Sequence, residues 1–416
     1  GSAKLLDQLF ALGLIPRYAF PTDVATFAVF EDDADAYRPT LLYSPQQALN
    51  AALAQYAPGH EVWIDGKRHL SLGIWSAFEE ERLQAYRDRK LYFHCHTCDY
   101  AMLVEGDAGT VGQTQDCPAC NAKAGMGPAQ RWVRPVGFAH PPSVLATPPR
   151  IEGTTNSRPT RAKLDAPHFA PTLRVGGASW PLGSSWEAWR DNRDLVVTNR
   201  GTQTSQAQGF RYCTQCGRTE PADLDQSLRQ LQGGGSSHAR PRPRKLKEPD
   251  TCSGTVTSIV IGNQFKTDIA IFRLQTPSDW SLDPSRAATV IAAKSAVEAL
   301  IRAASEDLEP GDIDGDYRFA PGANAASLLD LYIYDQAAGG AGFVKAAAAD
   351  PVGLVTAALK ILDDCTCEDS CYQCLRSYKN RFDHADLDRR LGADLLRACF
   401  FGVAPTVSDD WAAGAL

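Results

Sequence analysis

Twelve cysteines constrain this 416-residue sequence more than any other feature, because nearly all of them fall into closely spaced groups. No secretory signal pattern accompanies them, so metal binding is favoured over disulfide formation as their use. Eleven of the twelve, together with one histidine, form three sets of four, and four such ligands complete a tetrahedral zinc site. Cys399 is left over in the apolar run LLRACF, where a free cysteine is ordinary core filling. The sequence therefore predicts a fold stapled by about three structural zinc ions.

The first set has the spacing of a zinc ribbon. Two CxxC pairs, separated by 18 residues, lie between segments with strand-like patterns; they are Cys95/Cys98 and Cys117/Cys120. Each CxxC forms a tight turn that aims two thiolates at one point, so two such turns complete a tetrahedron. We expect a four-cysteine ribbon over 91–138.

The second set combines the CxxC of Cys213 and Cys216 with the distant Cys252, which leaves one ligand position to fill. His238 is the one histidine between Cys216 and Cys252, so we favour it as the fourth ligand. The alternative is that His238 is a loop residue and that the fourth position is taken by water or is absent.

A basic run adjoins this set, and a metal held by His238 and Cys252 would pin it at both ends. We expect phosphate contacts from Arg240, Arg242, Arg244, Lys245 and Lys247. The alternative is a solvated loop, which is the commoner fate of a charged run.

The third set is the stretch CTCEDSCYQC, which holds Cys365, Cys367, Cys371 and Cys374 directly after a predicted helix. A CxC pair cannot easily close an unstrained disulfide, whereas four thiolates can surround one ion. An iron–sulfur cluster is the competing interpretation, although its usual run repeats two-residue gaps that this stretch lacks. Three basic residues follow and are further candidates for phosphate contacts: Arg376, Lys379 and Arg381.

The pattern of the chain predicts a mixed α/β (α+β) fold in several parts. Apolar periodicity and capping residues, among them Ser44 and Asp350, favour helices over 4–12, 45–56, 285–304, 351–363 and 386–400. Alternation favours a hairpin over 61–75 with a type I′ turn at Asp65-Gly66, a β-rich run over 253–274 with a turn at Gly262-Asn263, and a buried strand over 330–336.

Several chemistries are disfavoured by the sequence. It contains no GxxxxGK[ST], so we expect no ATP hydrolysis by this chain, and no apolar run is long enough to cross a membrane. The net charge of −7 argues against a general polyanion binder and restricts DNA contacts to local basic patches. Asp268 and Asp335 lie on buried-strand patterns, where they can serve a metal-dependent nuclease or, as we favour, hydrogen bonding and turn capping.

The stretch LYIYDQAAGGAGF, followed by a helix and CTCEDSCYQCLRSY, resembles the MrfA-type zinc-binding (MZB) domain that closes a group of superfamily 2 DNA helicases. Shorter phrases such as LIPRYAFPTDV, YAPGHEVWIDGK, GFRYCTQCG and IGNQFKTDIAIFRL resemble the region after the two motor domains of such helicases. Ser370 stands where the family usually has glycine. The resemblance implies a metal role for the four cysteines of 365–374.

The resemblance also implies the surroundings of the chain. The partners would be DNA, the ATP-driven motor domains of the same parent protein, and proteins of mitomycin-type repair or of DISARM and Druantia phage defence. ATP would bind in those motor domains alone, and the setting would be cytoplasmic. The rival interpretation is a protein–protein scaffold that does not touch DNA, and a cryptic nuclease is a remote third.

The expected organisation has six parts: an α/β segment after the motor domains (1–90), the ribbon (91–138), a linker or wrapping loop (139–175), a β-rich segment with the second zinc site (176–284), an MZB-like α/β domain with the third (285–400), and a tail (401–416).

Overall fold

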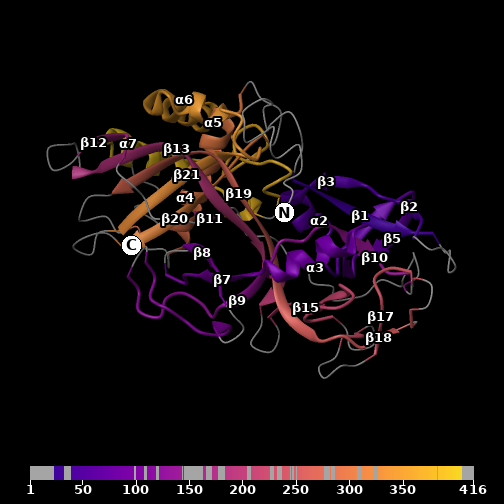
Figure 1. Cartoon of the computed structure of the whole chain (residues 1–416). Helices are drawn as coiled ribbons and strands as arrows, with labels where there is room; N and C mark the ends of the chain where they lie inside the picture. The colour runs from indigo at the N-terminus through magenta and orange to yellow at the C-terminus, as the bar shows by residue number, and fades with distance from the viewer. Residues whose placement is uncertain are drawn as a thin grey trace, which may run out of the picture.

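The fold comes from a computed structural model, shown in Figure 1. The structure describes residues 23–31, 39–97, 100–106, 110–118, 121–142, 144, 163–164, 171–176, 183–203, 208–224, 229–231, 237–243, 245, 248–249, 251–275, 282, 286–306, 312–321, 327–381 and 383–404. The predicted helix over 4–12 and most of the predicted linker lie outside these residues.

One long strand organises the centre of the molecule. β19 (Val256–Gln275) pairs antiparallel with β13 (Ser185–Asn199) from Ser185↔Gln275 to Asn199↔Ile261. Its first residues also pair with β15 (Gln208–Cys213), and its last residues pair with β21 (Ser327–Asp335). β-Branched and aromatic residues dominate β19, as a strand buried on both faces requires. The strand therefore connects the two ends of the molecule (Figure 1).

Within the described residues, this strand belongs to a 12-stranded sheet with the path β11-β13-β19-β9-β7-β8. The further strands are β7 (Lys90–His94), β8 (Ala101–Val104), β9 (Gln130–Val133), β11 (Lys163–Leu164), β12 (Leu173–Gly176), β14 (Thr202–Gln203), β16 (Thr219–Pro221) and β20 (Ile313–Pro321). The ribbon, linker, β-rich and C-terminal segments expected from the sequence all contribute strands to it.

Helices cover one face of this sheet at its C-terminal end. They are α4 (Ala287–Ala304), α5 (Phe343–Ala347), α6 (Pro351–Asp364) and α7 (Arg389–Phe401), with a short 3-10 turn η5 (His384–Asp386). Small residues let α4 and α7 approach closely: a Cβ on Gly392 would lie 2.8 Å from Cβ of Ser295. Trp186, Phe272 and Phe400 lie in the core beneath these helices. The tight packing makes this lobe a firm base for the loop after α6.

A smaller sheet forms the N-terminal part, with β1 (Val24–Phe30), β2 (Leu41–Tyr43), β3 (Gln46–Ala48), β6 (Gly73–Ile74) and β10 (Phe138–His140). α2 (Leu49–Gln55) and α3 (Glu79–Arg87) accompany it, with the hairpin of β4 (Glu61–Ile64) and β5 (Lys67–Leu70). Phe27 and Phe138 share a core with Phe210 and Ile259 of the central strands. A separate short pair joins β17 (His238–Ala239) to β18 (Thr251–Cys252).

The mixed α/β prediction is confirmed, as are several local ones. Asp65 and Gly66 have φ of 50° and 68°, which is the positive-φ pair that a type I′ turn needs. Asp350 caps α6 by accepting from the N–H of Gly353 at 3.0 Å. α4 begins and ends close to the expected residues.

Two predictions were wrong. The turn at Gly262-Asn263 does not exist, because β19 continues through it. Gly262 instead allows close approach, since a Cβ there would lie 2.2 Å from Nε1 of Trp132. The helix expected from 45 begins at Leu49, because residues 46–48 pair with β1 as β3. Sheet pairing therefore outweighed the capping signal at Ser44.

Among the described residues, the helices are all too short or too polar to be a membrane span.

Candidate metal centres

The structure brings the second ligand set together. The ligand atoms of Cys213, Cys216, His238 and Cys252 all lie within 4.8 Å of one another. The Sγ atoms of Cys213 and Cys252 are 3.9 Å apart, and Sγ of Cys216 is 3.3 Å from Nε2 of His238. Tetrahedral zinc with bonds of about 2.3 Å to sulfur separates its ligands by about 3.8 Å, so the cluster has the size of a zinc site. All four residues are buried, which suits a closed structural site.

The local fold explains how such distant ligands converge. The CxxC turn ends β15, and β19 begins beside it with Cys213 opposite Val256. His238 is directly opposite Cys252 in the β17–β18 pair, so sheet register fixes both ligands at once. The N–H of Gly254 points at Sγ of Cys252 at 3.4 Å, a contact that stabilises a thiolate. Within the set, the hydrogen bond from Cys216 lowers the pKa of the Cys213 thiol.

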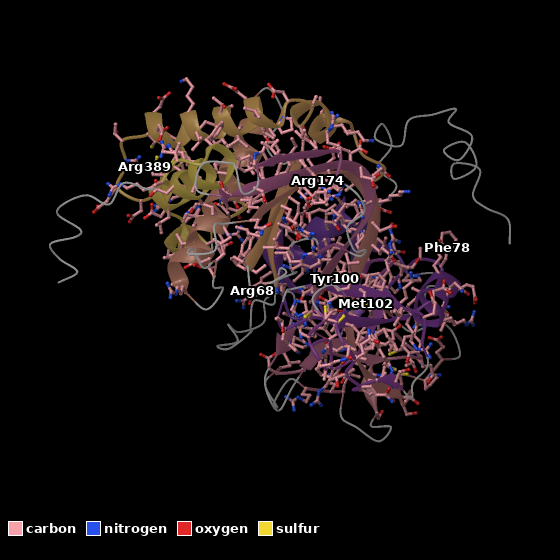
Figure 2. The ribbon with its side chains drawn as sticks, turned by 90° about the vertical axis from the view of Figure 1, so that its left-hand side faces the viewer. Arg68, Phe78, Tyr100, Met102, Arg174 and Arg389 are labelled. Atoms are coloured by element: carbon pink, nitrogen blue, oxygen red, sulfur yellow. The ribbon has the colours of Figure 1, made fainter. Side chains whose placement is uncertain are left out.

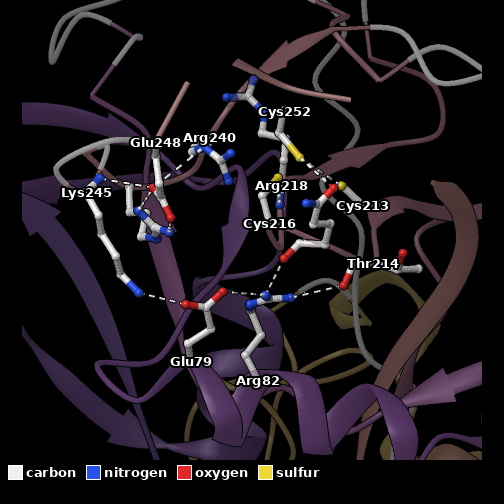
Figure 3. A network of polar contacts seen from close by, with 12 residues as sticks. Glu79, Arg82, Cys213, Thr214, Cys216, Arg218, Arg240, Lys245, Glu248 and Cys252 are labelled. Atoms are coloured by element: carbon white, nitrogen blue, oxygen red, sulfur yellow. Dashed lines mark hydrogen bonds and ion pairs between the residues drawn. The ribbon is translucent and has the colours of Figure 1, made fainter. Parts of the chain in front are cut away.

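A buried arginine ties this cluster to the N-terminal part (Figure 3). Arg82 of α3 donates to the backbone carbonyls of Thr214, at 3.4 Å, and of Gln215, and it contacts the hydroxyl of Tyr212 at 3.3 Å. Glu79, one turn earlier on the helix, lies 3.8 Å from the same guanidinium. Helix α3 thus holds the turn that carries two of the ligands.

The basic loop beside the cluster is ion-paired. The two Nη atoms of Arg242 donate one hydrogen bond to each carboxylate oxygen of Glu248, both at 2.9 Å. The same carboxylate lies 3.9 Å from Nε of Arg240. Lys245 reaches Glu79 at 2.7 Å. The hydrogen bond from Arg242 lowers the pKa of Glu248 to about 2, so the carboxylate is charged at neutral pH. Arg244 and Lys247 lie outside the described residues.

The third ligand set also converges. The Sγ atoms of Cys365 and Cys367 are 3.4 Å apart, those of Cys367 and Cys374 are 3.7 Å apart, and those of Cys371 and Cys374 are 3.8 Å apart. All four ligand atoms lie within 4.8 Å of one another. The cluster is only partly buried, with Cys374 its innermost member.

Backbone and arginine contacts shape this third cluster. Burial opposes ionisation of Cys371, but the N–H of Gln373 and neighbouring donors lower its pKa to about 7, which favours a thiolate. Arg389 of α7 donates to the carbonyl of Cys367 at 2.7 Å and to that of Leu362 at 3.2 Å. It therefore joins the end of α6 to the cysteine loop, and Figure 2 shows it beside the C-terminal helices.

The segment after this cluster carries basic and aromatic side chains. Nε of Arg376 donates to Oγ of Ser370 at 3.0 Å, so the residue at the atypical serine position has a partner. The guanidinium of Arg381 lies over the ring of Tyr378 at 4.4 Å. Tyr372 projects from the cysteine turn itself, with its ring edge-on to His384 at 5.4 Å. Tyr372 and Tyr378 are 63% and 76% exposed.

The ribbon set is described in part. Cys95 and Cys117 are both buried in one cluster, and Thr97 N–H points at Sγ of Cys95 at 3.4 Å. The lobe that holds them contains Tyr100, labelled in Figure 2. Cys98 and Cys120 lie outside the described residues, so the four-cysteine ribbon stays a prediction.

Asp335 caps the glycine-rich turn, as expected. One of its oxygens accepts the N–H groups of Ala341, Gly342 and Phe343 at 2.7–3.2 Å, and the other accepts that of Val344 at 2.9 Å. Burial raises the pKa of Asp335, and these donors oppose the rise. Backbone N–H groups in a glycine-rich turn before a helix can bind a phosphate, but here the carboxylate of Asp335 occupies them.

Asp268 is likewise engaged in hydrogen bonding. It accepts from Asn192 Nδ2 at 2.7 Å and pairs with Lys345 at 2.6 Å. A Cβ on Gly340 would lie 2.3 Å from the carboxylate of Asp268. A glycine is therefore needed where the glycine-rich turn passes over Asp268 of β19. Both aspartates thus serve the turn, and this argues against a nuclease centre built on them.

The sequence did not reveal Arg82, Arg389, Tyr372 or Tyr378 as members of these sites. Both arginines contact backbone carbonyls contributed by other elements, and no local pattern signals that. The tyrosines had a signal in principle, since each stands in a polar, turn-rich stretch with no apolar periodicity to bury it.

Comparison with known proteins gives a family for the C-terminal lobe. Residues 296–375 match the family model of the MrfA Zn-binding domain, a range that includes the third cluster. The Druantia protein DruE of Escherichia coli (strain UMEA 4076-1) is 30% identical over 422 residues, which cover 97% of this chain and 22% of that protein. The chain therefore spans about a fifth of the length of the curated relative it matches.

A solved structure is also similar. The crystal structure of the DUF1998 helicase MrfA bound to DNA aligns with a TM-score of 0.37 and 9% identity, covering 86% of this chain and 32% of that one. The family resemblance expected from the sequence is confirmed by the domain match and the relative.

Proposed function

We propose that this chain is a zinc-stapled accessory region of an ATP-dependent DNA helicase, because residues 296–375 match the family model of the MrfA Zn-binding domain. In this proposal three zinc ions hold its parts together, ATP binds in motor domains elsewhere in the parent protein, and the chain works in the cytoplasm, where thiols stay reduced. The similarity to DruE favours phage defence over repair as its pathway.

We further propose that the chain contacts DNA through 370–381, named here the basic–aromatic segment. One observation carries this: the segment contains Arg376, Lys379 and Arg381 but no acidic residue. The nearest acids downstream, Asp383 and Asp386, are paired with Lys294 at 3.0 and 2.7 Å. Glu368 and Asp369 directly precede the segment, which itself places three cations within six residues, a local basic patch of the kind that contacts phosphates.

The loop 240–247 is the second candidate contact. Its described charges already have carboxylate partners, and the side chains of Arg240 and Arg242 are each only 10% exposed. DNA would have to compete with Glu248 for both arginines, so we expect a smaller contribution from this loop.

A protein–protein scaffold is the rival function, supported by the net charge of −7 and by the ion pairs of the basic loop. A DNA titration at about 50–200 mM salt distinguishes the DNA-binding function from the scaffold function. Changing Lys379 and Arg381 to Ala should weaken binding for all sequences. It should also reduce the slope of log K against log salt, by up to about 0.9 per lost phosphate contact on duplex DNA and about 0.7 on single strands.

The matched control changes Arg240 and Arg242 to Ala, which removes the same amount of charge from the paired loop. Arg376 stays in place in both variants because it donates to Ser370 beside the third cluster. Equal losses from both pairs of changes would contradict the assignment to the basic–aromatic segment. No measurable DNA binding by the unmodified, zinc-loaded chain would favour the scaffold.

A further inference from the structure

We infer that the basic–aromatic segment binds single-stranded DNA by stacking bases on Tyr372 and Tyr378. This inference rests on the proposed DNA contact and names its substrate class. The two rings are exposed by 63% and 76%, although tyrosine rings usually bury most of their apolar surface. Both belong to a segment that is held firmly by the protein, so their exposure is not the result of a loose chain end.

The third cluster fixes one of the two rings. Tyr372 lies between Cys371 and Cys374, whose Sγ atoms are 3.8 Å apart, and the N–H of Cys371 points at Sγ of Cys374 at 3.2 Å. A tight cysteine turn of this kind leaves little backbone freedom at the residues inside it. The ring of Tyr372 meets the ring of His384 edge-on at 5.4 Å, and an edge-on contact does not cover both faces of the tyrosine ring. The ring is thus presented to solvent in a set orientation at low entropic cost.

The second ring is braced in a different way. Arg381 lies over Tyr378 at 4.4 Å, and its Nη1 also donates to the Tyr378 carbonyl at 3.2 Å. The same turn is closed by Asn380, which donates to the carbonyl of Leu375 at 2.8 Å and is buried. A guanidinium on one face makes the ring a better platform, because the cation also attracts the phosphate of a stacked nucleotide.

The charges near the two tyrosine rings favour a nucleic acid over a peptide as their ligand. An aromatic surface alone suits a peptide as well as a base, but Arg376 lies between the two tyrosines in the sequence and Lys379 and Arg381 follow Tyr378, with no acid from 370 to 381. Exposed rings interleaved with cations are the arrangement that single-stranded nucleic acid needs, since bases stack while phosphates meet the cations. Duplex DNA keeps its bases stacked internally and offers the rings no partner.

The test measures binding of the full, zinc-loaded chain to three labelled probes: oligo-dT, an abasic strand of equal length, and a duplex of equal length. The variants are Tyr372→Ala and Tyr378→Ala, with Tyr372→Phe and Tyr378→Phe as matched controls that keep the ring. Each Ala change should weaken oligo-dT binding by about 5- to 100-fold, leave the abasic and duplex probes unchanged, and be rescued by Phe.

The outcomes separate this inference from the proposed function. If oligo-dT and the abasic strand bind equally to the unmodified chain and the Ala variants match it, stacking is overturned while DNA contact stands. If no probe binds, the proposed DNA contact fails and stacking fails with it. A partner protein whose binding is lost in the Ala variants, without any DNA effect, would show that the rings serve a protein. Unchanged zinc content in each variant checks that the third cluster is intact.

Discussion

At the scale of single residues, the buried polar groups of this molecule mostly serve turns and loops. Asp335 satisfies four backbone N–H groups, and Arg82 and Arg389 satisfy carbonyls of the two cysteine loops. Such groups are costly to leave unpaired, at about 1–3 kcal/mol each, so their partners fix the loops in place. His69 is the contrasting case: it is 1% exposed, and neither ring nitrogen has a hydrogen-bond partner among the described residues.

His69 should make folding stability depend on pH. Burial lowers its pKa to about 4, helped by the nearby His140 ring at 5.0 Å and by Lys67. The folded chain therefore keeps His69 neutral, whereas the unfolded chain takes up a proton below about pH 6.5. Its stabilising contribution is present above pH 6.5 and is lost as the pH falls toward 4.

Thermal unfolding of the unmodified chain and of His69→Phe at pH 7, 6 and 5 checks this. The unmodified chain should lose more Tm between pH 7 and 5 than the variant, which lacks the titrating ring. Zinc release at low pH affects both proteins alike and cancels in the comparison. Parallel loss of Tm in the two proteins would show that His69 does not titrate as described.

At the scale of elements, the cysteine loops depend on helices far away in sequence. Helix α3 holds the second cluster through Arg82, and α7 holds the third through Arg389. In both cases a guanidinium bridges from a helix to the carbonyls of a ligand turn. The ligand turns are thus stabilised from outside, in addition to the zinc that we propose they bind.

Changing Arg82 to Ala should therefore loosen the second cluster selectively. The change leaves the carbonyls of Thr214 and Gln215 without their donor, at a cost of roughly 1–3 kcal/mol. We expect one zinc per chain to pass to a chelator several-fold faster, while the rest is released at the original rate. The measurement is zinc transfer to a chromogenic chelator over time.

Arg87→Ala is the control on the same helix. Arg87 is 58% exposed and pairs with Glu80 at the surface, a contact worth about 0–1 kcal/mol, so zinc release should not change. Faster release of all zinc from the Arg82 variant would indicate general unfolding, and equal release from both variants would mean that α3 does not support the cluster.

The sequence predicted what is encoded locally. CxxC spacing, the Asp65-Gly66 turn and the Asp350 cap are properties of a few neighbouring residues, and His238 could be chosen because it is the one histidine between Cys216 and Cys252. Contacts between distant elements were not predictable. The predicted turn at Gly262 was wrong because this glycine lets the side chain of Trp132 approach the strand closely, and Trp132 belongs to a strand about 130 residues earlier.

At the scale of the whole molecule, one sheet and two described cysteine clusters connect the parts into which the sequence analysis divided the chain. β19 starts at the second cluster and ends in the core of the C-terminal lobe, under the helices that carry the third cluster. The ion pair between Lys245 and Glu79 joins the basic loop to α3 in the N-terminal part. We therefore propose that the zinc sites staple the ends of a continuous framework and that the basic–aromatic segment is its exposed DNA-binding surface.

Elemental analysis of the purified chain is the sharpest test of the three zinc sites. We expect about three zinc and negligible iron per chain, about two zinc for Cys371→Ser, and about three for Cys399→Ala, which removes a buried cysteine outside the ligand sets. A brown protein with iron and labile sulfide would contradict this expectation, as would a Cys371→Ser variant that holds as much zinc as the unmodified chain.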